Sequence, residues 1–298
     1  MEYVYNASSG KQLTKEQFLD YFEKKVRKTI RTNNLIGKKE KVLVALSGGK
    51  DSTTTAYLLN KIIKNRNVSI EGFHIDVGIG EYSKINKKHT EEFCKEYNIT
   101  LHQTSFREQF GYSLCYMKGV AKQKGMNIKS CNMCGILKRY LLNKKAKEIH
   151  ATKLATGHNL DDEAQAIIMN MFQNTMPVMA RLGPMSGGQQ QKGFVQRIKP
   201  LYFCAEEEVR LYSKIMNFPV KYEKCPCQTE AYRREVKEML TEFEKKHPQT
   251  KYSVVRSLLE MLPALKKEYG GSVQYCKQCG EPSAGNVCNV CNLFNKMK

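Results

Sequence analysis

The chain alternates between short segments that predict strands and longer segments in which apolar residues recur every three or four positions. The segment at 42–46 is continuously apolar, which is typical of a strand buried on both faces of a parallel sheet. Further strands are predicted at 68–77, 99–104, 153–156 and 198–203. The amphipathic segments predict helices from residue 53, at 84–97, 136–149, 161–173 and 206–217, and twice within 229–266. Strands that alternate with helices predict an α/β fold with a doubly wound parallel sheet.

A further helix is predicted before the sheet begins. Thr14 and Gln17 match a capping box, and apolar residues then repeat every four positions at Phe18, Phe22, Val26 and Ile30. Residues 1–13 are expected to be irregular. The other helix face is basic and could contact RNA phosphates, although a solvated helix face is the commoner explanation of such a run.

The segment that follows the first strand carries the sequence SGGKDS. A strand, a glycine turn and a new helix together form a phosphate cradle, because glycines admit an oxyanion and the helix offers unpaired N–H groups. The candidate phosphate-binding residues are Ser47, Gly48, Gly49, Lys50, Asp51 and Ser52. Their spacing differs from the Walker A loop, so a kinase or GTPase is disfavoured.

Two later strand ends carry polar residues that should face the same crevice. His74 and Asp76 lie at the end of the second strand, and GHNLDD follows the strand at 153–156. Gly157 allows close approach of backbone. Asp161 and Asp162 are candidate catalytic acids that could hold magnesium or orient the substrate, while capping of the next helix explains one of the two aspartates well.

The net charge of the chain indicates which class of binding partner to expect. Lys and Arg number 49 against 29 Asp and Glu, a formal net charge of +20. This excess favours a polyanion, and nucleic acid over a membrane surface, since no apolar run approaches about 18 residues. The alternative explanation of the positive charge is a general richness of the chain in Lys and Asn. The N-terminus lacks a signal pattern, so we expect a cytoplasmic protein.

Eleven cysteines in a reducing compartment indicate metal or redox chemistry rather than disulfides. The most specific signal is a pair of CxxC motifs separated by eight residues near the C-terminus. Two such knuckles predict one tetrahedral zinc site in a segment too short to fold otherwise. Its ligands would be Cys276, Cys279, Cys288 and Cys291.

A second cysteine group is less regular. Cys131 and Cys134 form a lone CxxC, which fits a redox pair, half of a metal site or two core thiols. Cys225 precedes a proline, a pattern that recurs in iron–sulfur ligation, and three thiolates would leave one iron open. Cys227 makes the third ligand ambiguous.

The SGGxDS signature resembles the PP-loop of the ATP pyrophosphatase superfamily. Together with CNMC, GHNLDD, the Cys-Pro segment and the C-terminal CxxC pairs, in this order, the chain from about residue 14 resembles the TtuA-like tRNA 2-thiolation family. The resemblance implies a transfer of AMP from ATP to a carbonyl oxygen, a [4Fe-4S] cluster on Cys131, Cys134 and Cys225, and catalytic roles for Lys138 and Asp162. It also implies ATP contacts at Ala45, Leu46, Ser47, Asp51, His74, Lys138, Gly157 and Asp162.

One departure from the family pattern concerns the N-terminus. Family members usually begin with a zinc knuckle of paired CxxC motifs, and no cysteine precedes Cys94 here. We therefore predict four regions: 1–36 with the basic helix and no knuckle, 37–220 as the PP-loop domain, 221–270 as a helical extension carrying the third cluster cysteine, and 271–298 as the zinc-binding end.

The resulting hypothesis is an ATP-dependent tRNA 2-thiouridine synthase with ATP, Mg, [4Fe-4S] and Zn as cofactors. Uridine 34 of tRNA is favoured over uridine 54 as the target. The sulfur donor is either sulfide or a thiocarboxylated ubiquitin-like protein, and the resemblance implies a homodimer. Alternatives are a persulfide on Cys131 or Cys134 without a cluster, an RNA-binding scaffold with a vestigial nucleotide site, and a PP-loop ligase or amidotransferase.

Overall fold

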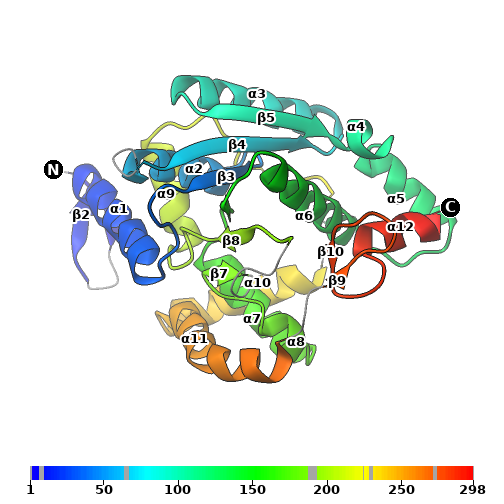
Figure 1. The fold of residues 1–298 in the computed structure, drawn as a ribbon. Helices are drawn as coiled ribbons and strands as arrows, with labels where there is room; N and C mark the ends of the chain where they lie inside the picture. The colour runs from blue at the N-terminus through cyan, green and yellow to red at the C-terminus, as the bar shows by residue number, and fades with distance from the viewer. Residues whose placement is uncertain are drawn as a thin grey trace.

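The central sheet of the protein contains six strands in the order β5–β4–β3–β6–β8–β7 (Figure 1). The computed structural model describes residues 2–6, 10–63, 67–186, 193–223, 225–227, 231–270 and 274–297. The strands are β3 (Lys41–Leu46), β4 (Ser69–Asp76), β5 (Thr100–Ser105), β6 (Lys153–Ala155), β7 (Met185–Ser186) and β8 (Gln196–Ile198). All neighbours pair in parallel except β7 with β8. The predicted α/β fold with a mostly parallel sheet is confirmed.

The strand order creates a switch point between β3 and β6. From β3 the chain moves outward through β4 to β5, and from β6 it moves to β8 on the other side. The loops that follow β3 and β6 both begin at the carboxyl ends of these two strands, and this switch-point region is called the crevice below. Ligands of open α/β sheets bind at such a crevice.

Alternate residues of β3 enter two different cores, as expected for a strand covered on both faces. Val42 and Val44 pack with one set of helices and Leu43 with the other. The first set is α1 (Lys15–Thr32), α2 (Lys50–Ile63), α3 (Gly80–Glu96) and α9 (Glu206–Ile215). The second set is α4 (Phe106–Phe110), α5 (Leu114–Gln123), α6 (Ser130–Glu148) and α12 (Asn289–Met297).

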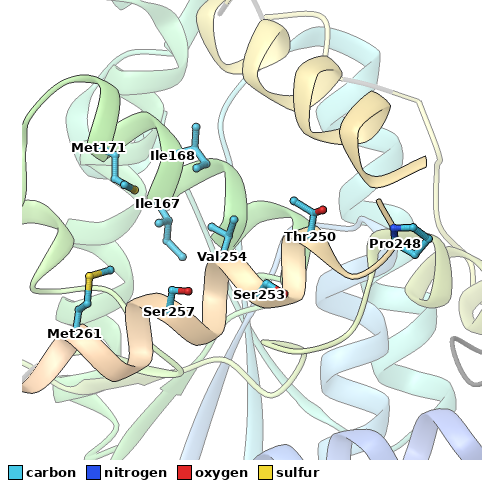
Figure 2. Close-up of a pocket in the computed structure, with 9 residues that line it drawn as sticks. All are labelled: Ile167, Ile168, Met171, Pro248, Thr250, Ser253, Val254, Ser257 and Met261. Carbon is cyan, nitrogen blue, oxygen red and sulfur yellow. The ribbon is translucent and has the colours of Figure 1, made fainter. Parts of the chain in front are cut away.

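A third apolar core joins α7 (Leu160–Phe172) and α8 (Met176–Met179) to α10 (Ala231–Lys246) and α11 (Thr250–Tyr269). These helices lie together below the sheet in Figure 1. An open pocket of about 380 Å³ lies between α7 and α11, where Ile167, Met171 and Val254 line it with Met261 (Figure 2). It shares no lining residue with the predicted site. No described helix is long and apolar enough to cross a membrane.

Several local predictions were wrong. Residues 1–13 are not irregular throughout, since β1 (Tyr3–Asn6) and β2 (Gln12–Thr14) form an antiparallel hairpin. Tyr5 fixes the hairpin by packing on Phe18 and donating to Glu208 at 3.0 Å, contacts that local sequence does not reveal. The strand expected at 198–203 ends at Ile198, and α4 and α5 were not predicted. The capping box of Thr14 and Gln17 is confirmed.

Candidate functional site

The loop between β3 and α2 is held by its own serine residues. The Ser47 amide donates to Ser52 Oγ at 3.1 Å, and the Ser52 hydroxyl donates to the Gly49 carbonyl at 3.0 Å. Gly48 has φ +79°, and a Cβ there would lie 2.7 Å from Cβ of Asn86. Only glycine fits this position, so the loop shape is fixed by the protein itself. The N-terminus of α2, which begins at Lys50, faces the same crevice.

Charged side chains beside this loop form a connected network. Lys50 Nζ pairs with Asp51 at 2.9 Å and with Glu206 at 3.2 Å, and Lys237 donates to Glu206 at 2.6 Å. Burial alone would raise the pKa of Glu206, but these two lysines outweigh that effect and lower the pKa to about 2. Lys50 is therefore tied to acidic partners on α2 and α9, at the entrance to the predicted phosphate cradle.

The loop after β6 touches the loop after β3. A Cβ on Gly157 would lie 2.7 Å from the Asp51 carbonyl carbon, so the two backbones are in direct contact. Asn159 donates its side-chain amide to Asp51 at 3.0 Å. The same asparagine caps α7 in a capping box with Asp162. The structure thus brings the two predicted motifs together at the switch point.

The two neighbouring aspartates of this loop have different surroundings. Asp161 accepts from the Glu206 amide at 2.7 Å and from Lys251 at 2.6 Å, so it joins α9 and α11 to α7. Asp162 pairs with Arg233 at 3.1 Å and is close enough to Asp51 to raise the pKa of that carboxyl. Burial is the main cause of the raised pKa at Asp51 and at Asp162. Two adjacent carboxylates of this kind could hold a divalent cation.

His74 lies at the end of β4 with its side chain buried. Its Nδ1 lies 3.0 Å from the Leu46 carbonyl, and its Nε2 is one of the buried side-chain atoms without a hydrogen-bond partner among the described residues. Burial lowers the pKa of His74, and Lys138 lowers it further. The imidazole is therefore neutral, with Nε2 unpartnered and Lys138 near enough for its charge to lower the pKa. Asp76 accepts from the Gly78 amide at 2.7 Å and shapes the turn into α3.

Cys131 and Cys134 lie in the first turns of α6, and Cys225 reaches them from a distant segment. Burial raises the pKa of Cys134, Lys138 opposes this shift, and Cys225 and Cys131 add to it. The Cys131 thiol donates to the Cys227 carbonyl at 3.6 Å. An isolated β-bridge between Gly49 and Lys221 connects the phosphate loop to the same segment. Three thiols that converge beside apolar residues of the second core fit an iron–sulfur cluster.

Cys227 has a different neighbour from Cys225. Its pKa is raised by burial and then by Cys115, whose thiol interacts with the Cys227 thiol. Cys115 lies on α5 and is exposed. The pKa of Cys134, in contrast, is raised by Cys225. The Cys134 thiol is thus influenced by Cys225 and the Cys227 thiol interacts with Cys115, and the choice of Cys225 as the third ligand stays a prediction.

The four C-terminal cysteines converge tightly. Their sulfur atoms all lie within 4.8 Å of one another, with Cys279 and Cys288 3.7 Å apart. Burial raises the pKa of Cys276, but amide donors from Cys288, Cys279 and Gln278 lower it to about 6. Four sulfur ligands at this spacing fit the tetrahedral zinc site that the sequence predicts.

Sequence reasoning missed two charged residues of the nucleotide crevice. Glu206 and Arg233 reach the crevice from α9 and α10, and no local motif surrounds either one. Asn159 lies inside the recognised GHNLDD motif, but its bond to Asp51 depends on the contact between two loops. Only its position before a helix, typical of an N-cap, could have drawn attention to it.

Comparison with known proteins agrees with this geometry. Residues 19–236 match the PP-loop domain family. The chain is 36% identical to tRNA-5-methyluridine(54) 2-sulfurtransferase of Pyrococcus horikoshii, over 96% of this chain and 88% of the relative. It is 31% identical to the tRNA 2-thiolation protein NcsA of Haloferax volcanii, over 99% and 96%.

A solved structure is similar over almost the whole chain. The U34-tRNA thiolase NcsA from Methanococcus maripaludis, determined with its [4Fe-4S] cluster, superposes with a TM-score of 0.84 and 33% identity. The match covers 98% of this chain and 93% of that one. The chain therefore belongs to the PP-loop family of tRNA 2-thiolation proteins.

Proposed function

We propose that the protein is an ATP-dependent tRNA 2-thiouridine synthase that replaces the carbon-2 oxygen of uridine 34 with sulfur. The observation that carries this proposal is the position of Lys138. It is close to His74 at the nucleotide crevice and to Cys134 of the cysteine group, so it connects the two. A site for oxygen activation and a site for sulfur delivery are thereby adjacent.

The nucleotide half would activate the oxygen. The carbon-2 oxygen of uridine is a poor leaving group. Transfer of AMP from ATP to this oxygen, with release of pyrophosphate, makes it a good one that departs as AMP when sulfur attacks carbon 2. The amides of Gly48 and Gly49 and the N-terminus of α2 would bind the phosphates, while Asp51 and Asp162 would hold Mg²⁺ on them. Lys138 stabilises negative charge that develops on the reacting phosphate and oxygen.

The cysteine half would supply sulfur to carbon 2. A [4Fe-4S] cluster held by three thiolates has one iron without a protein ligand, which supplies a binding position for a sulfur atom. Cys131, Cys134 and Cys225 would hold this cluster. Cys134 is half-buried beside apolar residues of the second core, which would limit the access of water to the activated carbon.

The proposal also specifies which uridine of the tRNA is modified. The solved relative from Methanococcus maripaludis is named as a U34-tRNA thiolase, which supports position 34. The relative from Pyrococcus horikoshii is named for position 54, which is the alternative. We further propose a cytoplasmic homodimer with zinc on the four C-terminal cysteines, and sulfide or a thiocarboxylated ubiquitin-like protein as sulfur donor.

Position-resolved mass spectrometry tests this function. An unmodified tRNA transcript is incubated anaerobically with the purified protein, ATP, Mg²⁺ and, in parallel reactions, sulfide or a thiocarboxylated ubiquitin-like protein, and is then cut into fragments. A mass increase of one oxygen-to-sulfur exchange is expected in the fragment that contains uridine 34, and only when ATP is present. The same exchange in the T-loop fragment would instead establish position 54, and no exchange in any fragment would refute the proposed activity.

A further inference from the structure

Two exposed tyrosines lie side by side at the start of α5. The rings of Tyr112 and Tyr116 are parallel to within 11°, with centroids 4.8 Å apart. Their exposed fractions are 47% and 56%, and neither ring belongs to one of the three apolar cores. The pair therefore contributes little to folding and presents aromatic faces to solvent.

The backbone that carries these rings is anchored to the ligand edge of the sheet. The Leu114 amide donates to the Val77 carbonyl, one residue beyond β4, at 3.0 Å. Leu114 and Met117 are fully buried in the second core, and a Cβ on Gly78 would lie 2.7 Å from Cβ of Ser113. The tyrosines are thus held rigidly beside the carboxyl end of β4.

The same helix lies against the Cys-Pro-Cys segment. Cys115, between the two tyrosines in sequence, faces Cys227, and the carbonyl of Cys227 accepts from the Cys131 thiol. The platform formed by Tyr112 and Tyr116 is consequently next to the proposed sulfur-delivering cysteines.

The surrounding sequence is strongly basic. Residues 109–147 contain nine Lys and Arg residues and no Asp or Glu. Lys118, Lys122 and Lys129 are exposed on α5 and just before α6. A basic surface attracts any polyanion, but exposed parallel aromatic rings within it match single-stranded nucleic acid, because bases stack on such rings while lysines contact phosphates.

We propose that Tyr112 and Tyr116 form a stacking platform for an unpaired base of the RNA substrate, with Lys118 and Lys122 on the adjacent phosphates. This inference rests on the proposed function and adds the path by which the RNA strand enters the site. A base stacked here holds the strand in an unpaired conformation next to the cysteines. The target uridine, a neighbour in the same loop, can then reach the crevice.

Equilibrium binding tests the platform. Fluorescence anisotropy with a labelled seven-nucleotide RNA of anticodon-loop sequence is measured on the anaerobically purified protein. Tyr112→Ala and Tyr116→Ala are each expected to weaken binding about tenfold, whereas the Phe variants, which keep the ring, stay within about twofold. Lys118→Ala with Lys122→Ala should reduce the slope of log K against log salt by about 1.4. Tyr3→Ala is the matched control, because Tyr3 is an exposed tyrosine of the β1–β2 hairpin and β2 lies at the opposite end of the molecule from α5 in Figure 1.

Crosslinking locates the contact in the unmutated protein. An RNA with 5-iodouridine in the loop is irradiated in the complex and the protein is digested with trypsin. Crosslinks should lie in the peptide 108–118, which holds both tyrosines. If the protein binds RNA but both Ala variants bind as tightly as wild type and crosslinks fall elsewhere, the platform is refuted and the proposed function stands. If the unmutated protein binds neither this RNA nor tRNA, both proposals are refuted.

Discussion

The two cysteine groups of this protein are built in opposite ways. The C-terminal four are contributed by two tight turns within residues 276–291, and their sulfur atoms meet within 4.8 Å. The other group takes Cys131 and Cys134 from the start of α6 and Cys225 from a segment about ninety residues later. Local sequence therefore forms the first group, and only the completed fold forms the second.

The two cysteine groups also differ in the residues that surround them. The C-terminal group packs on α4 through Phe294 and Phe110, whose ring centroids are 5.4 Å apart, and on α6 through the Lys147–Glu281 pair at 2.6 Å. The second group is bordered by Lys138, which also reaches the nucleotide crevice. A set of four thiolates fills the coordination shell of a metal, whereas three leave a position for chemistry. We therefore expect the C-terminal group to stabilise the fold and the other group to take part in the reaction.

The largest expected effect is on the reactive group. Cys134→Ser should lower the rate of tRNA thiolation at least about a hundredfold, because a ligand of the proposed cluster is lost. ATP binding and the thermal midpoint should change little. Thiolated nucleosides are quantified by mass spectrometry, and a variant with normal activity would remove Cys134 from the reaction.

A matched pair of variants sharpens the assignment of the third ligand. Cys225→Ser should reduce iron content and activity as strongly as Cys134→Ser. Cys227→Ser should leave both near wild type, because the Cys227 thiol interacts with Cys115 rather than Cys134. The reverse outcome, with Cys227→Ser inactive and Cys225→Ser active, would exchange the two assignments.

A mutation in the C-terminal cysteine group should lower the stability of the protein. Cys279→Ser removes one of four ligands and should abolish zinc retention and lower the thermal midpoint by about 5 °C. Activity measured well below that midpoint should fall much less than for Cys134→Ser. Calorimetry and metal analysis check both expectations, and complete inactivation of the still folded variant would contradict the division of roles.

The smallest effect concerns the contact between the C-terminal group and α6. Glu281 pairs with Lys147 and accepts from Asn143 at 3.2 Å, with its side chain mostly buried. Glu281→Gln should cost about 1 kcal/mol of unfolding free energy, since Lys147 is partly exposed and its charge is screened by solvent. Combining it with Lys147→Met in a double-mutant cycle isolates the pair. Additive effects would show that the pair contributes nothing.

The sequence predicts these regions unequally, for physical reasons. The apolar runs and the capping box of Thr14 indicate the strands and α1 because period and capping are local properties. Tyr5 and Glu208, in contrast, meet across about two hundred residues, so the β1–β2 hairpin has no local signal strong enough to reveal it. The α4 capping box of Ser105 and Glu108 is a local signal that could have been recognised.

The same distinction applies to the site. The motifs SGGKDS and GHNLDD are visible in sequence, and the contact between Gly157 and Asp51 confirms that they meet. The difference between Asp161, which joins three helices, and Asp162, which faces Asp51, is invisible there because both occupy the first turn of α7. The sequence therefore identifies the two loops, whereas the packing of the folded chain determines which partners each aspartate has.

One measurement decides whether the nucleotide crevice and the three distant cysteines act as a single site. The protein is purified without oxygen, its iron is quantified, and ATP-dependent formation of 2-thiouridine is measured before and after iron is removed by a chelator. We predict about four iron atoms per chain, ATP-dependent thiolation, and loss of thiolation when the iron is removed while ATP binding is retained. A colourless protein without iron that thiolates tRNA at the same rate would contradict this result and favour a persulfide on Cys131 or Cys134.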